Sequence, residues 1–221
     1  QRLPIAGCGL LRPCQHGGMT PALPVLCICG PSAAGKTTFA ASLSRALQDC
    51  GRQPLLIACD DYYRQDWSPH PLFGFDTADA IDDQALRADL SAARQGQAQT
   101  LRLYDMRTRR VDRRPIQQPY DVILLEGAYG PQHLVNDFPF SGVVYLEESV
   151  PRRLWRRLRR DVRDRHRSPR YVIRQMFREM LPGERHFIQP LKQSAAVVIK
   201  DQASGLVQVL ALLGSAPVDN D

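Results

Sequence analysis

Nine residues from Gly30 to Thr38 carry the clearest chemical pattern in the chain. They read Gly-Pro-Ser-Ala-Ala-Gly-Lys-Thr-Thr and contain the G-x-x-x-x-G-K-[ST] spacing of a phosphate-binding P-loop. Glycines let such a loop bend around phosphate groups, and the N–H groups at the start of the next helix point toward them. The lysine of the motif reaches the β- and γ-phosphates, and the hydroxyl after it ligates Mg²⁺. We therefore predict a nucleoside triphosphate site formed by Gly30, Ser32, Ala33, Ala34, Gly35, Lys36, Thr37 and Thr38.

The residues on either side of the loop have the order that a P-loop requires. Residues 25–29 are apolar and predict a buried strand, while residues 39–48 are rich in Ala and Leu and predict a helix. The alternative is a glycine-rich turn that matches by chance, on the order of once in a hundred chains of this size. The flanking strand and helix favour the phosphate site.

Acidic residues follow two further predicted strands. Asp60 and Asp61 come directly after the apolar residues 54–59, and Glu126 lies at the end of the apolar stretch 121–127. Ligands of open α/β sheets bind beyond the carboxyl ends of the strands, so these carboxylates are expected near the P-loop. We assign chemistry to Asp60 and a turn-capping role to Asp61. A carboxylate at the end of a strand is also typical of the acidic Mg²⁺-holding element of P-loop enzymes. The predicted Mg²⁺ ligands are Thr37, Asp60 and Glu126.

The remaining pattern alternates strands with helices. Further strands are predicted at residues 141–147 and 195–199, further helices at 79–94 and 206–213, and a hairpin that pairs 101–105 with 113–116. Residues 67–82 are rich in Pro and aromatic residues and predict a loop that runs into the helix at 79. This order predicts an α/β protein with the three-layer P-loop NTPase fold, in which helices cover both faces of a mostly parallel five-stranded sheet.

An arginine-rich segment separates the last two predicted strands. Residues 152–170 contain ten arginines and only two acids, and the apolar residues Leu154, Leu158 and Val162 predict an amphipathic helix. Four of the arginines share one face of that helix: Arg156, Arg160, Arg163 and Arg167. The segment can be a solvated face, a nucleic-acid-binding face or a lid over the triphosphate. We favour the lid, because guanidinium groups neutralise the charge that develops in phosphoryl transfer.

Composition sets the remaining limits. The chain has 221 residues, a net charge of +6 and no apolar run near the ~20 residues of a membrane helix. Its six cysteines lack zinc-finger spacing, which predicts a reducing, cytoplasmic setting, and Cys27, Cys29 and Cys59 fall in predicted strands and are expected in the core. We expect residues 1–20 to be a disordered extension or a segment foreign to the natural chain, with Met19 as a plausible start. Residues 21–221 then form one kinase-sized domain with a lid at about 152–181.

Several ordered motifs between residues 25 and 199 resemble the uridine kinases and their relatives among small-molecule kinases, which include phosphoribulokinase and pantothenate kinase. The matching motifs are Asp60-Asp61-Tyr62-Tyr63, Phe75-Asp76 with Asp79-Ala80, Tyr104-Asp105, Glu126-Gly127, Arg160-Asp161 with Arg165 and Arg167, and Pro190-Leu191-Lys192. The resemblance implies an ATP-dependent kinase that phosphorylates a hydroxyl, most simply the 5′-hydroxyl of a nucleoside.

The resemblance also implies roles for individual residues. Asp60 is the expected general base. The other expected catalytic groups are Lys36, Arg160, Arg165 and Arg167, and the expected substrate-binding residues are Tyr63, Phe75, Asp76, Tyr104, Arg109, Arg157 and Gln175. Arg109 stands where uridine kinases carry a base-contacting histidine, and Thr77-Ala78 replaces His-Pro. The part that reads the base is therefore altered.

Two alternatives stay open. One is a kinase for another acceptor, such as a sugar phosphate, pantothenate or another vitamin, which Arg107 and Arg109 would suit. The other is an ATP-dependent nucleic-acid-binding protein that uses the arginine helix; it ranks lower because no RNA-binding aromatic signature accompanies that helix. The expected partner is a small-molecule substrate, and we expect neither a membrane nor nucleic acid as a partner. The sequence leaves open whether the chain forms a homo-oligomer.

Overall fold

The computed structural model describes residues 21–164 and 166–214. The expectations for residues 1–20 and the catalytic role assigned to Arg165 lie outside these ranges. No helix in the described ranges is both long enough and apolar enough to span a bilayer.

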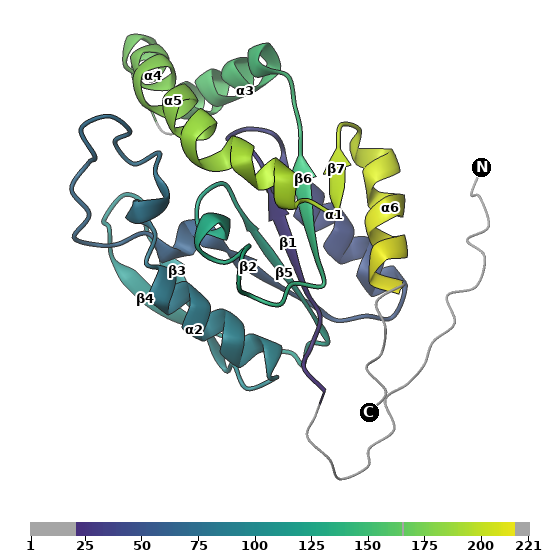
Figure 1. Cartoon of the computed structure of the whole chain (residues 1–221). Coiled ribbons are helices and arrows are strands. Elements are labelled where there is room, and N and C mark those ends of the chain that lie inside the picture. The colour runs from purple at the N-terminus through teal and green to yellow at the C-terminus, as the bar shows by residue number, and fades with distance from the viewer. Residues whose placement is uncertain (1–20, 165, 215–221) are drawn as a thin grey trace.

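Five parallel strands form the central sheet (Figure 1). Their order is β2-β5-β1-β6-β7. Their bounds are β1 (Val25–Cys29), β2 (Pro54–Ala58), β5 (Val122–Gly127), β6 (Gly142–Leu146) and β7 (Val197–Ile199). The predicted hairpin is confirmed as a separate antiparallel pair, β3 (Thr100–Tyr104) with β4 (Val111–Pro115).

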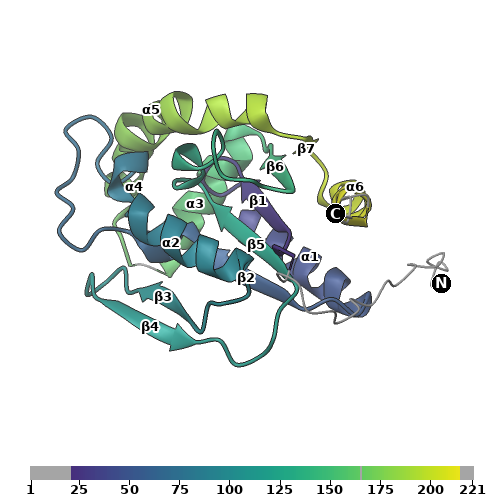
Figure 2. The ribbon, with the colours of Figure 1, turned by 60° about the horizontal axis from the view of Figure 1, so that its bottom comes forward.

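Helices cover both faces of the sheet and rise above its carboxyl edge (Figures 1 and 2). Their bounds are α1 (Lys36–Asp49), α2 (Asp83–Arg94), α3 (Val150–Arg163), α4 (Pro169–Gln175), α5 (Leu181–Gly183) and α6 (Gln202–Gly214). Helical turns of the π type, Met176–Met180 and Glu184–Ile188, precede and follow α5, so the chain stays helical from α4 into the 3₁₀ turn Gln189–Ser194.

Alternate side chains of the strands pack on opposite helical layers. On β1, Val25 and Cys27 face a cluster that includes Leu86 of α2. Leu26 and Ile28 face the opposite cluster, to which α1 and α6 contribute. This period of two, with apolar residues on both faces, is typical of a parallel sheet between two helical layers. The three-layer P-loop fold predicted from the sequence is therefore confirmed.

The register of the sheet sets the geometry of the site. Glu126 on β5 lies opposite Ile28 on β1 and opposite Ala58 on β2. The P-loop follows β1, and Asp60 follows β2 by two residues. The three elements with predicted chemistry therefore leave adjacent strands at the same edge.

Two local predictions need correction. The second helix begins at Asp83 and not at residue 79, because Ala78–Ala80 forms a separate 3₁₀ turn and the Asp82 carboxylate accepts the Ala85 N–H at 3.1 Å as an N-cap. Asp61 does not cap a turn; its carboxylate accepts the N–H of Tyr104 at 3.1 Å and ties the hairpin to the end of β2.

Candidate active site

The P-loop joins β1 to α1 through a strained backbone. Gly30, Ala33 and Gly35 have φ values of 141°, 61° and 94°, in the region that favours glycine. A Cβ on Gly30 would lie 2.4 Å from the Leu146 carbonyl oxygen, so only glycine permits this approach. Two residues predicted to bind phosphate, Gly30 and Ala34, are buried and do not line the cavity described below. They contribute to the shape of the loop.

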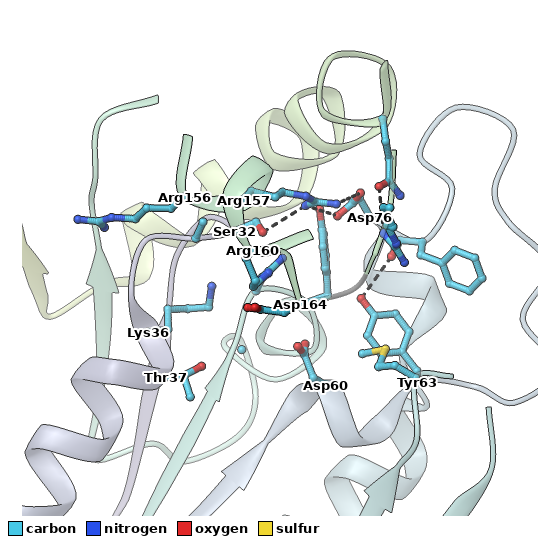
Figure 3. Close-up of a pocket in the computed structure, with 18 of the residues that line it drawn as sticks. Ser32, Lys36, Thr37, Asp60, Tyr63, Asp76, Arg156, Arg157, Arg160 and Asp164 are labelled. Atoms are coloured by element: carbon cyan, nitrogen blue, oxygen red, sulfur yellow. Dashed lines mark hydrogen bonds and ion pairs between the residues drawn. The ribbon is translucent and has the colours of Figure 1, made fainter. Parts of the chain in front are cut away.

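Four predicted residues meet where the P-loop faces the ends of β2 and β5. The Thr37 hydroxyl donates a hydrogen bond to Glu126 Oε1 at 3.0 Å, and Lys36 Nζ donates to the Pro31 carbonyl at 3.0 Å. Figure 3 shows Lys36, Thr37 and Asp60 facing the same hollow. The Asp60 carboxylate forms no hydrogen bond or ion pair with the described residues, which leaves it open to a ligand.

Burial and charge oppose each other in this group. Burial lowers the pKa of Lys36, while the nearby carboxylates of Glu126 and Asp60 raise it. Burial raises the pKa of Glu126, and Lys36 partly counters that effect. Lys36 and Glu126 therefore stabilise each other's charged forms, whereas the neighbouring Asp60 carboxylate adds to the rise in the pKa of Glu126.

The donor set suits a magnesium ion. Mg²⁺ prefers oxygen ligands, keeps several waters and takes only one or two carboxylates from a protein. Thr37 and Glu126 are already within 3.0 Å of each other, and Asp60 lines the same cavity. Among the described residues no three His, Cys, Asp or Glu side chains gather as a metal cluster, so the remaining ligands would be water and phosphate oxygens.

These residues line a cavity of about 1130 Å³ between the sheet edge and the arginine-rich helix. The predicted site residues on its wall are Ser32, Ala33, Gly35, Lys36, Thr37, Thr38, Asp60, Tyr63, Phe75, Asp76, Tyr104, Arg109, Glu126, Arg157, Arg160, Arg167 and Gln175. Segments spread from Ser32 to Gln175 thus converge on one cavity.

Aromatic rings form the end of the cavity beyond Asp60. The centroid of the Tyr63 ring lies 5.9 Å from the centroid of the Tyr104 ring and 6.5 Å from that of the Phe75 ring. The Arg109 guanidinium lies 5.5 Å from the Phe75 centroid and donates to the Trp67 carbonyl. Flat apolar surfaces beside a cation would suit a planar or anionic group.

Asp76 is not free in this structure. Arg157 Nη1 and Nη2 each donate to one of its carboxylate oxygens at 3.3 Å, and both side chains are buried. The same Arg157 Nη1 donates to the Ser32 hydroxyl at 3.2 Å. Figure 3 shows Arg157 between the P-loop and Asp76.

The arginine helix is amphipathic as predicted, and its apolar residues Leu154, Leu158 and Val162 pack on Val172, Met176 and Met180. The prediction that Arg167 shares a helix face with Arg156, Arg160 and Arg163 is wrong. The helix α3 ends at Arg163, and Arg167 lies on the connection to α4. Arg167 still lines the cavity, forms an ion pair with Asp161 at 3.5 Å and donates a hydrogen bond to Gln175 Oε1 at 3.4 Å.

Sequence reasoning missed several parts of the site. Residues that line the cavity without having been assigned to it are Met106, Gly127, Ala128, Tyr129, Arg156, Asp164, His166 and Tyr171. It also missed that acids distant in sequence relieve the repulsion within the arginine helix. Glu184 pairs with Arg153 and Asp76 with Arg157. No motif marks Glu184, and Arg153 is one arginine among ten, so the sequence offered no signal for this pair.

Comparison with known proteins decides the family. Residues 25–208 match the Phosphoribulokinase / Uridine kinase family. The chain belongs to this family. It is 32% identical over 187 residues to a uridine kinase of Halobacterium salinarum, covering 81% of this chain and 80% of that protein. Family membership makes the protein an ATP-dependent kinase that phosphorylates an alcohol.

Solved structures agree on the fold. A D-glycerate 3-kinase from Cryptococcus neoformans superposes with a TM-score of 0.58 at 16% identity, over 79% of this chain and 82% of that one. The phosphoribulokinase from Rhodobacter spheroides gives 0.57 at 14% identity, over 85% and 75%. At such identities the likeness concerns the fold alone.

Proposed function

We propose that this kinase transfers the γ-phosphate of ATP to the 5′-hydroxyl of a nucleoside, with uridine and cytidine as the first candidates. The observation that carries the proposal is one cavity lined both by Lys36, Thr37 and Asp60 and by the aromatic side chains of Tyr63, Phe75 and Tyr104. The similar protein from Halobacterium salinarum is named a uridine kinase, which supports the choice of acceptor.

In this proposal the P-loop holds the triphosphate. The backbone N–H groups at the start of α1 and the Lys36 ammonium bind phosphate oxygens. Thr37, Glu126 and Asp60 would hold Mg²⁺, which when bound neutralises charge on the phosphates. Arg160 and Arg167, which line the opposite wall, would neutralise the oxygens of the transferred group, and the family resemblance assigns the same role to Arg165.

Asp60 acts on the acceptor. Its open carboxylate orients the hydroxyl and takes its proton as the hydroxyl oxygen attacks the γ-phosphorus. Phe75 and Tyr104 hold the ring of the acceptor. The Asp76 carboxylate, now paired with Arg157, binds the sugar hydroxyls of the acceptor when Arg157 gives up part of that pairing. The lid formed by about residues 152–181 excludes water, which prevents hydrolysis of ATP.

A second candidate acceptor is an anionic small molecule such as a sugar phosphate. The observation that favours it is the pair Arg107 and Arg109 on the cavity wall, at the end that holds Phe75. Guanidinium groups bind phosphate through paired donors, so they suit such a substrate.

An ADP-release screen over nucleosides, sugar phosphates and pantothenate separates the candidates. The proposal predicts release that depends on uridine or cytidine. Release that depends only on a phosphorylated sugar would replace the nucleoside with the second candidate, and release with neither class would contradict both.

We also propose a cytoplasmic location. The described cysteines Cys27, Cys29, Cys50 and Cys59 are free thiols, and three of them are buried in the core. Free thiols are typical of a reducing compartment.

A further inference from the structure

Every polar group of Ser32, in the middle of the P-loop, is bound by the helices above the sheet. Its N–H donates to Glu184 Oε1 at 3.0 Å. Its carbonyl accepts from Arg153 Nη1 at 3.2 Å, and its hydroxyl accepts from Arg157 Nη1 at 3.2 Å. The backbone of one phosphate-loop residue is thus held from two separate helical segments.

The groups that hold the Ser32 backbone form a buried ion pair. Arg153 Nη1 lies 2.8 Å from both carboxylate oxygens of Glu184, and the two side chains are 5% and 3% exposed. Arg153 Nε donates to the Glu148 carbonyl at 3.1 Å, which fixes the guanidinium further. A buried pair contributes little net stability compared with apolar residues of the same size, so its presence calls for another explanation.

The loop itself needs an external restraint. Ala33, directly after Ser32, has φ 61°, a conformation that costs free energy for a residue with a Cβ. Such strain persists only where the surroundings hold the backbone in place. The bonds to both sides of Ser32 hold the peptide groups that lead into Ala33.

A close contact holds the helix that carries Glu184. A Cβ on Gly183 would lie 2.2 Å from the Asp76 carbonyl oxygen, so the helix packs directly on that backbone. Glu184 also begins a π-helical turn, a feature that occurs often at functional sites. Its carboxylate is therefore aimed at Ser32 by packing and not by chance rotation.

We propose that Glu184 and Arg153 are positioning residues that hold the P-loop in its phosphate-binding shape before the nucleotide arrives. They act through the Ser32 backbone and need not touch ATP or the acceptor. The inference rests on the proposed nucleotide site, and it predicts an effect on nucleotide binding with little effect on acceptor binding.

The first test measures the dissociation constant of ADP by calorimetry in the full chain. Glu184→Ala removes the carboxylate that the Ser32 N–H and Arg153 share, and we expect ADP affinity to fall roughly tenfold or more. Glu184→Gln keeps an oxygen for the Ser32 N–H, so we expect a smaller loss. Asp121→Asn is the matched control, because it removes the 2.7 Å pair with Arg52 at the opposite edge of the sheet and should leave affinity unchanged.

The double variant Arg153→Met/Glu184→Met separates positioning from stability. Apolar residues in place of a buried pair generally restore stability, but they cannot bind the Ser32 backbone. We expect the free energy of unfolding to recover while ADP affinity stays low. Recovery of both together would overturn the proposal, as would wild-type affinity in Glu184→Ala.

Hydrogen exchange at the P-loop amides gives a readout that does not depend on catalysis. We expect the Ser32 amide to be protected in the nucleotide-free wild type and to exchange faster in Glu184→Gln and Glu184→Ala. Equal exchange in all three proteins would refute the positioning role even if the kinase assignment stands. A wild type that protects Ser32 but binds no ADP would instead contradict the proposed function.

Discussion

Thr37 and Glu126 lie 89 residues apart in the chain, yet the hydroxyl of one donates to the carboxylate of the other at 3.0 Å. The pairing of β1 with β5 produces this contact, because it sets the end of β5 beside the start of the P-loop. Two oxygen groups at this distance, next to Lys36, form the part of the site best suited to a phosphate-bound metal.

Replacement of Glu126 with Gln should weaken metal use. The amide lacks the charge that attracts Mg²⁺, so the Mg²⁺ concentration for half-maximal activity should rise roughly 10- to 100-fold, the usual effect of a disturbed metal site. Titration of activity with Mg²⁺ measures it. Asp137→Asn, which removes an exposed ion pair with Arg87, serves as the control and should behave as wild type. An unchanged Mg²⁺ requirement in Glu126→Gln would remove Glu126 from the metal site.

The pH profile should depend on the metal. Burial raises the pKa of Glu126 above its ordinary value of 4.5, so as pH falls this carboxyl takes up a proton earlier than an exposed glutamate would. A protonated carboxyl ligates Mg²⁺ poorly, so at a given Mg²⁺ concentration activity should be lost on the acid side at a higher pH than an exposed glutamate ligand would give. Because metal and proton compete, a higher Mg²⁺ concentration should move this limb to lower pH. Profiles of kcat/KM at two Mg²⁺ concentrations that superpose on the acid side would contradict this.

Gly183→Ala should damage both stability and acceptor binding. The new Cβ would lie 2.2 Å from the Asp76 carbonyl oxygen, and such overpacking costs roughly 1–3 kcal/mol of unfolding free energy. The displaced Asp76 should raise the acceptor KM. Denaturant unfolding and steady-state kinetics measure the two effects. Gly214→Ala is the control, because a Cβ there meets nothing within 4 Å. It should change neither the free energy of unfolding nor the acceptor KM.

Phe75→Ala tests the acceptor end of the cavity. Loss of the ring that packs near Tyr63 and Arg109 should raise the acceptor KM roughly tenfold, the usual order for one lost stacking contact, with the KM for ATP unchanged. Phe177→Ala, on the exposed surface of the lid segment, should alter neither constant. A rise in the KM for ATP with an unchanged acceptor KM would place Phe75 at the nucleotide site and contradict its role in acceptor binding.

The sequence predicted those parts of the molecule in which local pattern and function coincide. Val25 to Thr38 show an apolar strand, a glycine loop and a helix in succession, so their structure follows from neighbouring residues. Asp60 and Glu126 could be placed because each ends a strand, and parallel strands end at a common edge.

The remaining parts depend on contacts between distant segments. Nothing near Glu184 in sequence indicates that it reaches Ser32, and the burial of Arg153 contradicts the usual fate of a charge run. The sequence also offered no indication that α3 ends at Arg163, because residues 164–167 continue the same charged composition.

Asp60→Asn tests the central claim most directly, namely that Asp60 activates a hydroxyl opposite the nucleotide in one cavity. Calorimetry should show ADP affinity close to that of wild type, because Asp60 contributes at most one of several groups around the phosphates. Turnover with the acceptor found by the ADP-release screen should fall roughly 10²- to 10⁴-fold, the usual contribution of a general base. Turnover within a few fold of wild type would contradict the account.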